Sequence, residues 1–207
     1  KFVGMRSAEQ EIVEAYFESN GFLIRKVGIP DESDSKKKKY PFPTMAVLNP
    51  VIRKNSRSLG FRVFTGDLNK FRAALVSRLG WENTAFTHSM LDSDARLNRF
   101  YKQEAYKERV SIGYNPAPDL AESRMGSYLR LLVIPAVPRS EIKMEELFHH
   151  FREIGVDGIL TLSSMLENLL RQSLKTQNYA GNGIFQLLRL LKVYQLAREP
   201  QLDFFIN

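Results

Sequence analysis

Residues 43–80, PTMAVLNPVIRKNSRSLGFRVFTGDLNKFRAALVSRLG, decide the fold that this sequence predicts. Residues 45–48 are a short apolar run that an Asn-Pro pair ends, and residues 59–64 predict a second strand that returns beside the first. Asp67 is a typical N-cap for a following helix, which Gly80 would end. The buried side of that helix is expected to hold Leu68, Phe71, Leu75 and Leu79. The stretch therefore predicts a strand hairpin with a basic turn, followed by a helix.

The segment before this stretch predicts a helix and a strand. Residues 7–20 repeat apolar positions at helical spacing behind a capping box in which Ser7 accepts a backbone bond and Gln10 returns one. Residues 22–27 then predict a short strand. Residues 30–43 begin with acids and end with four lysines, which favours an exposed loop. That loop is either a lysine finger for phosphates or a solubilising loop that pairs its own charges.

The second half of the chain predicts a strand–helix–strand unit followed by two helices. Residues 128–134 and 158–162 are nearly all apolar, as in strands buried on both faces, and a helix that Ser140 caps joins them. Such a unit demands a parallel pair with a right-handed crossover. The helix after residue 164 begins with a second capping box, and the last helix, residues 184–197, is apolar on most of its circumference. Other elements are expected as a strand near Ala85, a helix over 92–106, a strand over 110–114 and a loop over 115–126.

We therefore expect an α/β fold that forms one domain over residues 1–207. Residues 1–6 are expected to be a disordered or vector-derived tail, and residues 163–207 a C-terminal helical extension packed on the sheet. With 43% hydrophobic and 26% charged residues the composition is that of an ordinary globular protein. No apolar run reaches the ~20 residues of a membrane helix, so no membrane partner is expected. The chain has no cysteine, which excludes disulfides and thiolate metal sites and favours the cytoplasm.

This order of elements resembles the restriction-endonuclease-like fold of the PD-(D/E)XK nuclease superfamily. The N-terminal segment, SAEQEIVEAYFESNGFLIRK, is similar to the first helix and strand of archaeal Holliday-junction resolvases and related nucleases. The VLNP segment resembles the second strand of the fold. The resemblance implies a mixed central sheet flanked by helices, to which this chain adds C-terminal helices.

The resemblance also implies where a metal site would lie. In the family an acid on the first helix, matching Glu9, joins an Asp on the first hairpin strand and an acid-x-Lys triplet on the next strand. Alignment on the Asn-Pro turn places Thr44 at the Asp position and Gly60 and Arg62 at the ends of the triplet. Two carboxylates are needed to hold Mg²⁺ firmly, and arginine is too weak an acid to serve as a base. The motif is therefore expected to be degenerate, with no metal and no cofactor.

Two alternatives leave catalysis open. In the first, the missing carboxylate of the motif is supplied by Asp67. In the second, a different metal site uses Asp92 and Asp94. Mg²⁺ would be a cofactor only under one of these alternatives. His149 and His150 are not expected to chelate a metal, because adjacent helical side chains diverge by ~100°.

Charge favours a polyanion as partner. The net charge is +7 and the isoelectric point about 9.6, which suits DNA or RNA. The alternative is a basic, solvated surface with no ligand. The candidate phosphate-binding residues come from the hairpin and the helix start: Arg53, Lys54, Arg57, Arg62, Thr65, Gly66, Lys70 and Arg72.

Three functions follow from these patterns. The first is a catalytically inactive nuclease-like domain that binds nucleic acid or regulates a partner that does. The second is an active Mg²⁺-dependent nuclease with a relocated site. The third is a protein-interaction or assembly module without a nucleic-acid role, for which the apolar helix 184–197 is the expected contact surface, to a homo-oligomer or another protein.

Overall fold

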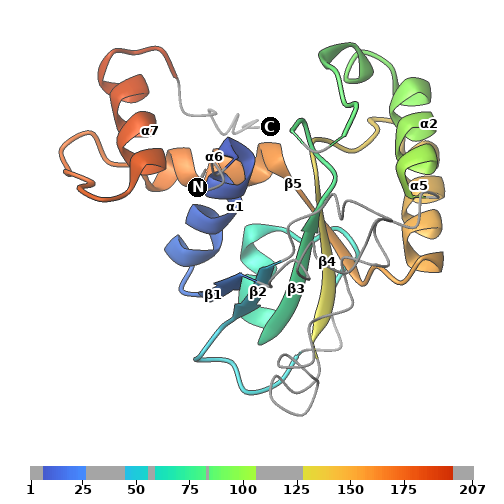
Figure 1. Ribbon diagram of the computed structural model, residues 1–207, viewed down its shortest axis with the longest axis horizontal. Helices are drawn as coiled ribbons and strands as arrows, with labels where there is room; N and C mark the ends of the chain where they lie inside the picture. Colours follow the sequence, from blue (N-terminus) through green and yellow to red (C-terminus); the bar gives the residue numbers. More distant parts are fainter. Residues whose placement is uncertain (1–6, 27–44, 56–58, 83, 106–127, 198–207) are drawn as a thin grey trace, which may run out of the picture.

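A single mixed sheet organises the chain. The computed structural model describes residues 7–26, 45–55, 59–82, 84–105 and 128–197. Within these residues five strands pair in their sequence order, the first three antiparallel and the last three parallel (Figure 1). The strands are β1 (Leu23–Lys26), β2 (Met45–Leu48), β3 (Ala73–Arg78), β4 (Leu129–Ile134) and β5 (Gly158–Thr161).

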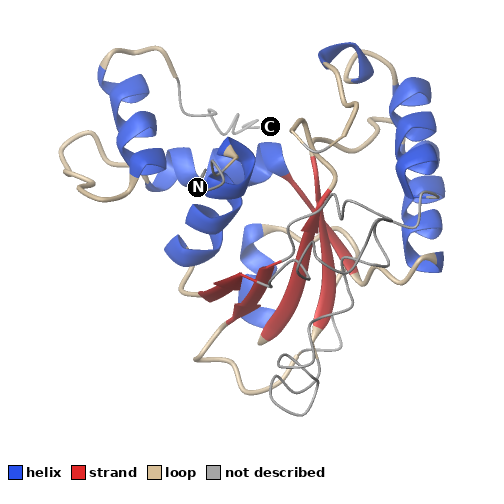
Figure 2. Ribbon diagram, in the orientation of Figure 1, coloured by secondary structure: helices blue, strands red, loops and turns tan. Residues whose placement is uncertain are grey.

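Helices cover both faces of the sheet (Figure 2). On one face lie α1 (Ala8–Ser19), α6 (Leu162–Gln172), α7 (Gly183–Val193) and the 3₁₀ helix η2 (Thr65–Lys70). On the other face lie α2 (Asp94–Ala105), α5 (Glu141–Glu153) and the short η3 (His88–Met90). The expected α/β class, with a mixed sheet flanked by helices, is confirmed.

Two apolar cores meet at the sheet, because the central strands are buried on both sides. Val76 of β3 packs with Phe17 and Met165 in the core under α1 and α6. Its neighbour Leu75 packs with Tyr101 and Phe151 in the core under α2 and α5. Alternate side chains of a strand point to opposite faces, so β3 divides the two cores.

Local signals predicted most of these elements. Ser7 caps α1 as expected, its Oγ accepting the backbone N–H of Gln10 at 3.2 Å. The predicted return bond from the Gln10 side chain to the start of the helix was wrong, because that side chain donates to Glu14 at 2.8 Å. The strand–helix–strand unit is confirmed, with β4 and β5 parallel on either side of α5 in sequence.

The deciding stretch was misassigned after its first strand. Residues 59–64 do not pair with β2; they approach the sheet through one bridge between Arg62 and Ile159 of β5. The predicted helix from Asp67 is η2, which ends at Lys70, and the chain then forms β3, the true partner of β2. The positions taken as one helical face are buried, but so are Ala73, Ala74 and Val76 between them. A run that is buried on both faces suits a central strand and not an amphipathic helix.

Smaller corrections concern helix ends. Thr161, not Ser164, is the N-cap of α6, and it accepts the Ser164 N–H at 3.3 Å. The described residues 84–87 do not form the strand predicted near Ala85, and the Thr84 hydroxyl donates to the Gly80 carbonyl. The last helix stops at Val193, earlier than predicted, and packs on both α6 and α1. The tail 1–6, the loop 30–43 and the segments 110–114 and 115–126 lie outside the described residues.

Candidate functional site

Glu9, the acid predicted on the first helix, is buried at the first turn of α1. Its side chain faces the turn that follows β3, and the residue is only 6% exposed. Oε1 accepts the backbone N–H of Trp81 at 2.9 Å, and Oε2 accepts that of Glu82 at 3.2 Å. Both carboxylate oxygens are thus occupied by amides of the protein itself.

Arg78, the last residue of β3, supplies the cation beside this carboxylate. Its Nη1 lies 3.8 Å from Glu9 Oε2 and 4.0 Å from Glu82 Oε2, and it donates to Ser7 Oγ at 3.1 Å. Burial lowers the pKa of Arg78, while the charges of Glu9 and Glu82 raise it. A buried guanidinium is tolerated only when it is paired, and these contacts supply the pairing.

Glu82 completes a reciprocal arrangement. Its carboxylate accepts the N–H groups of Ala8 at 2.9 Å and Glu9 at 3.3 Å, the first two amides of α1. A negative charge at a helix N-terminus satisfies free amides and interacts favourably with the helix dipole. The α1 acid therefore binds the turn after β3, and an acid of that turn binds α1. We call the group of Ser7, Glu9, Arg78 and Glu82 the α1–β3 lock.

Gly80 permits this close approach. A Cβ atom at this position would overlap both carboxylate oxygens of Glu9 and lie 2.6 Å from its Cδ. A residue with a Cβ atom therefore does not fit at position 80 while the Glu9 carboxylate keeps its two bonds to backbone amides. The glycine that was predicted to end a helix instead lets α1 reach the end of β3.

The chemistry that this arrangement allows is limited. Neither β2 nor β3 carries an Asp or a Glu, so Glu9 has no second carboxylate from the strands beside it. Within the described residues no three His, Asp or Glu side chains are placed to hold a metal ion. The α1–β3 lock combines two carboxylates with one guanidinium, and each carboxylate oxygen of Glu9 already accepts a backbone amide.

The other residues predicted for the degenerate motif are not brought together. Thr44 lies outside the described residues, although Met45, directly after it, pairs with Val76 near the Arg78 end of β3. Gly60 and Arg62 lie beyond β5, separated from β3 by two strands. The guanidinium of Arg62 lies over the Phe64 ring, 4.9 Å from its centroid. The assignment of an acid-x-Lys position to residues 60–62 was therefore wrong, because those residues are not in the strand next to β2.

Asp67 and Asp94, two of the three carboxylates considered as relocated ligands, have other partners. Asp67 accepts the Phe64 N–H at 3.0 Å and pairs with Lys70 at 2.7 Å, and these bonds lower its pKa. Asp94 at the start of α2 accepts the N–H groups of Arg139 at 3.0 Å and Ser140 at 2.8 Å. Those amides lead into α5, so Asp94 joins the two helices on that face.

Three of the residues predicted to bind phosphate lie together at a basic turn. Arg53 and Lys54 are exposed after β2, and Arg72, also exposed, lies against their turn. The Arg72 N–H donates to Asn55 Oδ1 at 2.7 Å, and its Nη1 to the Arg53 carbonyl at 3.5 Å. We call Arg53, Lys54 and Arg72 the basic turn. Arg57 lies outside the described residues.

The remaining phosphate-binding candidates have local partners. Thr65 exchanges a 3.0 Å hydrogen bond with the Tyr16 hydroxyl, and burial raises the pKa of Tyr16 to about 12. Lys70 is paired with Asp67, and Gly66 lies in η2. The helix that was predicted to begin at Asp67 is instead a six-residue 3₁₀ helix, which is too short for its dipole to attract a phosphate.

The basic turn and the α1–β3 lock lie at opposite ends of one strand. Arg72 directly precedes β3 and Arg78 ends it, so the two are about 20 Å apart at the rise of an extended strand. A ligand at the basic turn would therefore be held away from Glu9.

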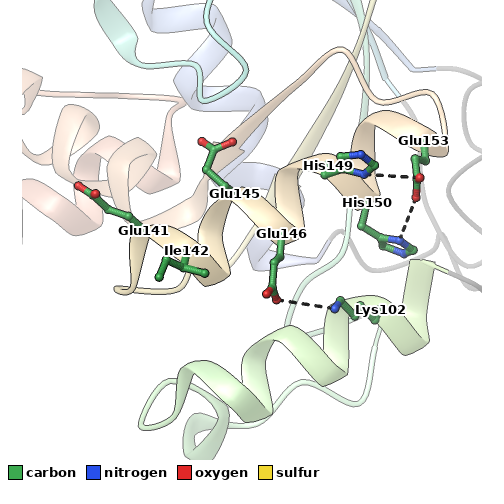
Figure 3. Close-up of a pocket in the computed structure, with 8 residues that line it drawn as sticks. All are labelled: Lys102, Glu141, Ile142, Glu145, Glu146, His149, His150 and Glu153. Carbon is green, nitrogen blue, oxygen red and sulfur yellow. Dashed lines mark ion pairs between the residues drawn. The ribbon is translucent and has the colours of Figure 1, made fainter.

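A separate open cavity of about 710 Å³ lies between α2 and α5 (Figure 3). Glu153 contacts both histidines there, His149 Nδ1 at 3.5 Å and His150 Nδ1 at 3.8 Å. Burial lowers the pKa of His150, against the raising effect of Glu153. Lys102 from α2 pairs with Glu146 across the cavity at 3.9 Å. The two histidines share one carboxylate, and each contact is an ion pair only when its imidazole is protonated, which burial disfavours at His150.

The sequence reasoning missed two residues of the lock, Arg78 and Glu82, and the role of Gly80 beside it. A signal was present, since a charged residue ends an apolar run and a Gly-Trp-Glu turn follows. Its meaning depended on β3 being a strand, which the helical assignment concealed.

Comparison with known proteins places no relative beside this chain: no family model, no curated protein and no solved structure matches it. Among the described residues, no helix combines the length and apolar character that a membrane crossing requires. Function is therefore inferred from the residues and their geometry.

Proposed function

We propose that this chain is a nuclease-like α/β domain without metal-dependent catalysis, which binds nucleic acid through its basic turn or regulates a partner that acts on nucleic acid. The observation that carries the proposal is the state of Glu9, whose carboxylate is held by two amides and Arg78. We place this function in the cytoplasm, since the chain has no cysteine.

The arrangement of elements supports the nuclease-like scaffold. A helix precedes three antiparallel strands, and a parallel strand joins the third, as in the restriction-endonuclease-like fold that the N-terminal segment resembles. In that resemblance the acid-x-Lys position belongs to the strand beside β2, which is β3. That strand carries no acid, and its only charged residue, Arg78, faces Glu9. Arg78 then supplies the positive charge that a metal supplies in the active members.

The basic turn supports contact with a polyanion. Arg53 and Lys54 are exposed, neighbouring cations, and the contacts of Arg72 hold it beside them. The net charge of +7 attracts phosphate at longer range. Three phosphates neutralised on a duplex would give a slope of log K against log salt of about −3.

A binding assay with matched charge variants tests the site. We expect Arg53→Glu with Lys54→Glu to weaken binding of a labelled duplex in fluorescence polarisation at least ~10-fold, and to reduce the salt slope by about 2. The control is Arg96→Glu with Arg99→Glu, an equal change of charge at exposed residues of α2. Equal losses in the two double variants would show binding by net charge alone and would refute the basic-turn site.

An active nuclease is the second candidate, favoured only by the survival of Glu9 at the family position. Incubation of DNA and RNA with the protein and Mg²⁺ or Mn²⁺ discriminates between the two. We expect no cleavage above buffer. Divalent-dependent cleavage that Glu9→Ala abolishes and Glu18→Ala, on the same helix, preserves would overturn the inactive assignment.

A further inference from the structure

The turn after β2 carries an apolar tip. Pro50 and Val51 are exposed, Val51 by 82%, and Ile52 beside them is half-buried. Surface turns favour small and polar residues, so two successive β-branched residues at this position are unusual. In Figure 1 the loop after β2, drawn in cyan, projects beyond the ends of the strands. The tip therefore meets any ligand that binds at this end of the sheet.

Backbone contacts of Arg72 hold this turn at both of its ends. The Arg72 carbonyl accepts the Asn49 N–H at 2.6 Å, and the Arg72 N–H donates to Asn55 Oδ1 at 2.7 Å. Within the turn the Val51 N–H donates to Asn49 Oδ1 at 3.0 Å, across Pro50, whose ring fixes its own φ. The position of Val51 is thus fixed although its side chain faces water. A projection that is already ordered loses little conformational freedom when it inserts into a partner.

Charge selects the partner of this tip. The exposed cations of the basic turn, Arg53, Lys54 and Arg72, flank it. An apolar side chain between cations suits a partner that is anionic at its surface and apolar beneath it. A DNA duplex has this layering, since its phosphates lie outside and its bases stack inside. An anionic membrane has it too, but stable membrane binding uses a large apolar helix face or a lipid chain, and Pro50 and Val51 supply neither.

We propose that Val51 is a wedge that enters the minor groove of a DNA duplex and separates one base step, while the basic turn binds the flanking phosphates. Apolar side chains that separate a base step kink the duplex by about 20–90°. Because unstacking costs free energy, the preferred substrate is a duplex in which one step is already weakly stacked, as at a nick. This inference rests on nucleic-acid binding by the basic turn, and it adds the class of substrate to that function.

Energy transfer between dyes at the two ends of a duplex of about 20 base pairs tests the wedge. On binding, the unaltered protein is expected to bring the ends closer, and it should bind a centrally nicked duplex at least ~10-fold more tightly than an intact one. Val51→Ser should abolish the approach of the ends and reduce that preference below ~3-fold. Val51→Leu keeps an apolar wedge and should retain both properties. Ile142→Ser, at a 75% exposed residue of α5, is the matched control and should behave as the unaltered protein.

The variants separate the wedge from the proposed function. Val51→Ser changes an exposed side chain and keeps the cations, so circular dichroism should show the native fold and the salt slope should stay at about −3. Arg53→Glu with Lys54→Glu should instead weaken binding of nicked and intact duplexes equally.

Three results would overturn the wedge and leave the basic-turn site in place: binding without bending, equal affinity for nicked and intact duplexes, or bending that survives Val51→Ser. The absence of any duplex binding by the unaltered protein would refute both the wedge and the basic-turn site. The wedge would also be overturned if the protein bound vesicles of phosphatidylcholine and phosphatidylserine and Val51→Ser abolished that binding, because the tip would then be a lipid contact.

Discussion

Truncation of the Glu9 side chain should destabilise the fold strongly, because the α1–β3 lock holds the start of α1 against the end of β3. Glu9→Ala removes the acceptor of two amide bonds, at 2.9 and 3.2 Å, and the nearest anion of a guanidinium that is 3% exposed. Breaking a buried ion pair by removing one partner typically costs about 3–5 kcal/mol. For a chain of this size that corresponds to a fall in Tm of roughly 6–20 °C.

Denaturation in urea, followed by circular dichroism and fluorescence, measures this change. Glu18→Ala, at an exposed position of the same helix, is the control and should shift the free energy of unfolding by no more than about 0.5 kcal/mol. Glu9→Gln keeps the side-chain shape and can still accept one amide bond, so it should lose less than Glu9→Ala and remain folded.

A double-mutant cycle separates the pair from the rest of the lock. Arg78→Met removes the cation while keeping an apolar stem of similar length. We expect Glu9→Gln with Arg78→Met to be more stable than the sum of the single changes by about 0.5–3 kcal/mol. The reasoning fails if Glu9→Ala costs less than about 1 kcal/mol, or if it stabilises the protein. A stabilising effect is what a carboxylate retained for catalysis at the expense of stability would give.

Two further predictions follow from neighbouring contacts. Gly80→Ala should lower the free energy of unfolding by about 1–3 kcal/mol, because the added methyl group would overlap the Glu9 carboxylate. Gly66→Ala, at a position with open space around it, is the control and should be nearly neutral. The cost of Gly80→Ala should be smaller in the Glu9→Ala background, and an unchanged cost would show that the Glu9 side chain is not the obstacle. Asp94→Asn should destabilise the protein at pH 7, since the amides of Arg139 and Ser140 hold the pKa of Asp94 below its ordinary value. Because the folded-state pKa is the lower one, this contribution is complete above the ordinary aspartate pKa of about 4 and is lost as pH falls through the folded value; a difference between the two proteins that stays constant from pH 7 to pH 3 would contradict it.

Sequence alone located the elements whose signals are local. Ser7 with the apolar spacing behind it defined α1, and the apolar runs at 128–134 and 158–162 defined the parallel strands β4 and β5. Exposed cations after β2 were also recognisable, because residues in a polar turn with no apolar spacing remain at the surface. These features depend on neighbours within a few residues, which the sequence shows directly.

Tertiary structure alone decided which strand pairs with β2 and what surrounds Glu9. Residues 73–79 suit a helical face and a strand buried on both sides equally well, and only packing between two cores selects the strand. That choice moved residues 59–64 to the far edge beside β5 and placed Arg78, not Arg62, next to Glu9. The lock joins residues more than seventy positions apart in the chain. Strand pairing and burial of charge are cooperative properties of the whole sheet, so no local pattern could have specified them.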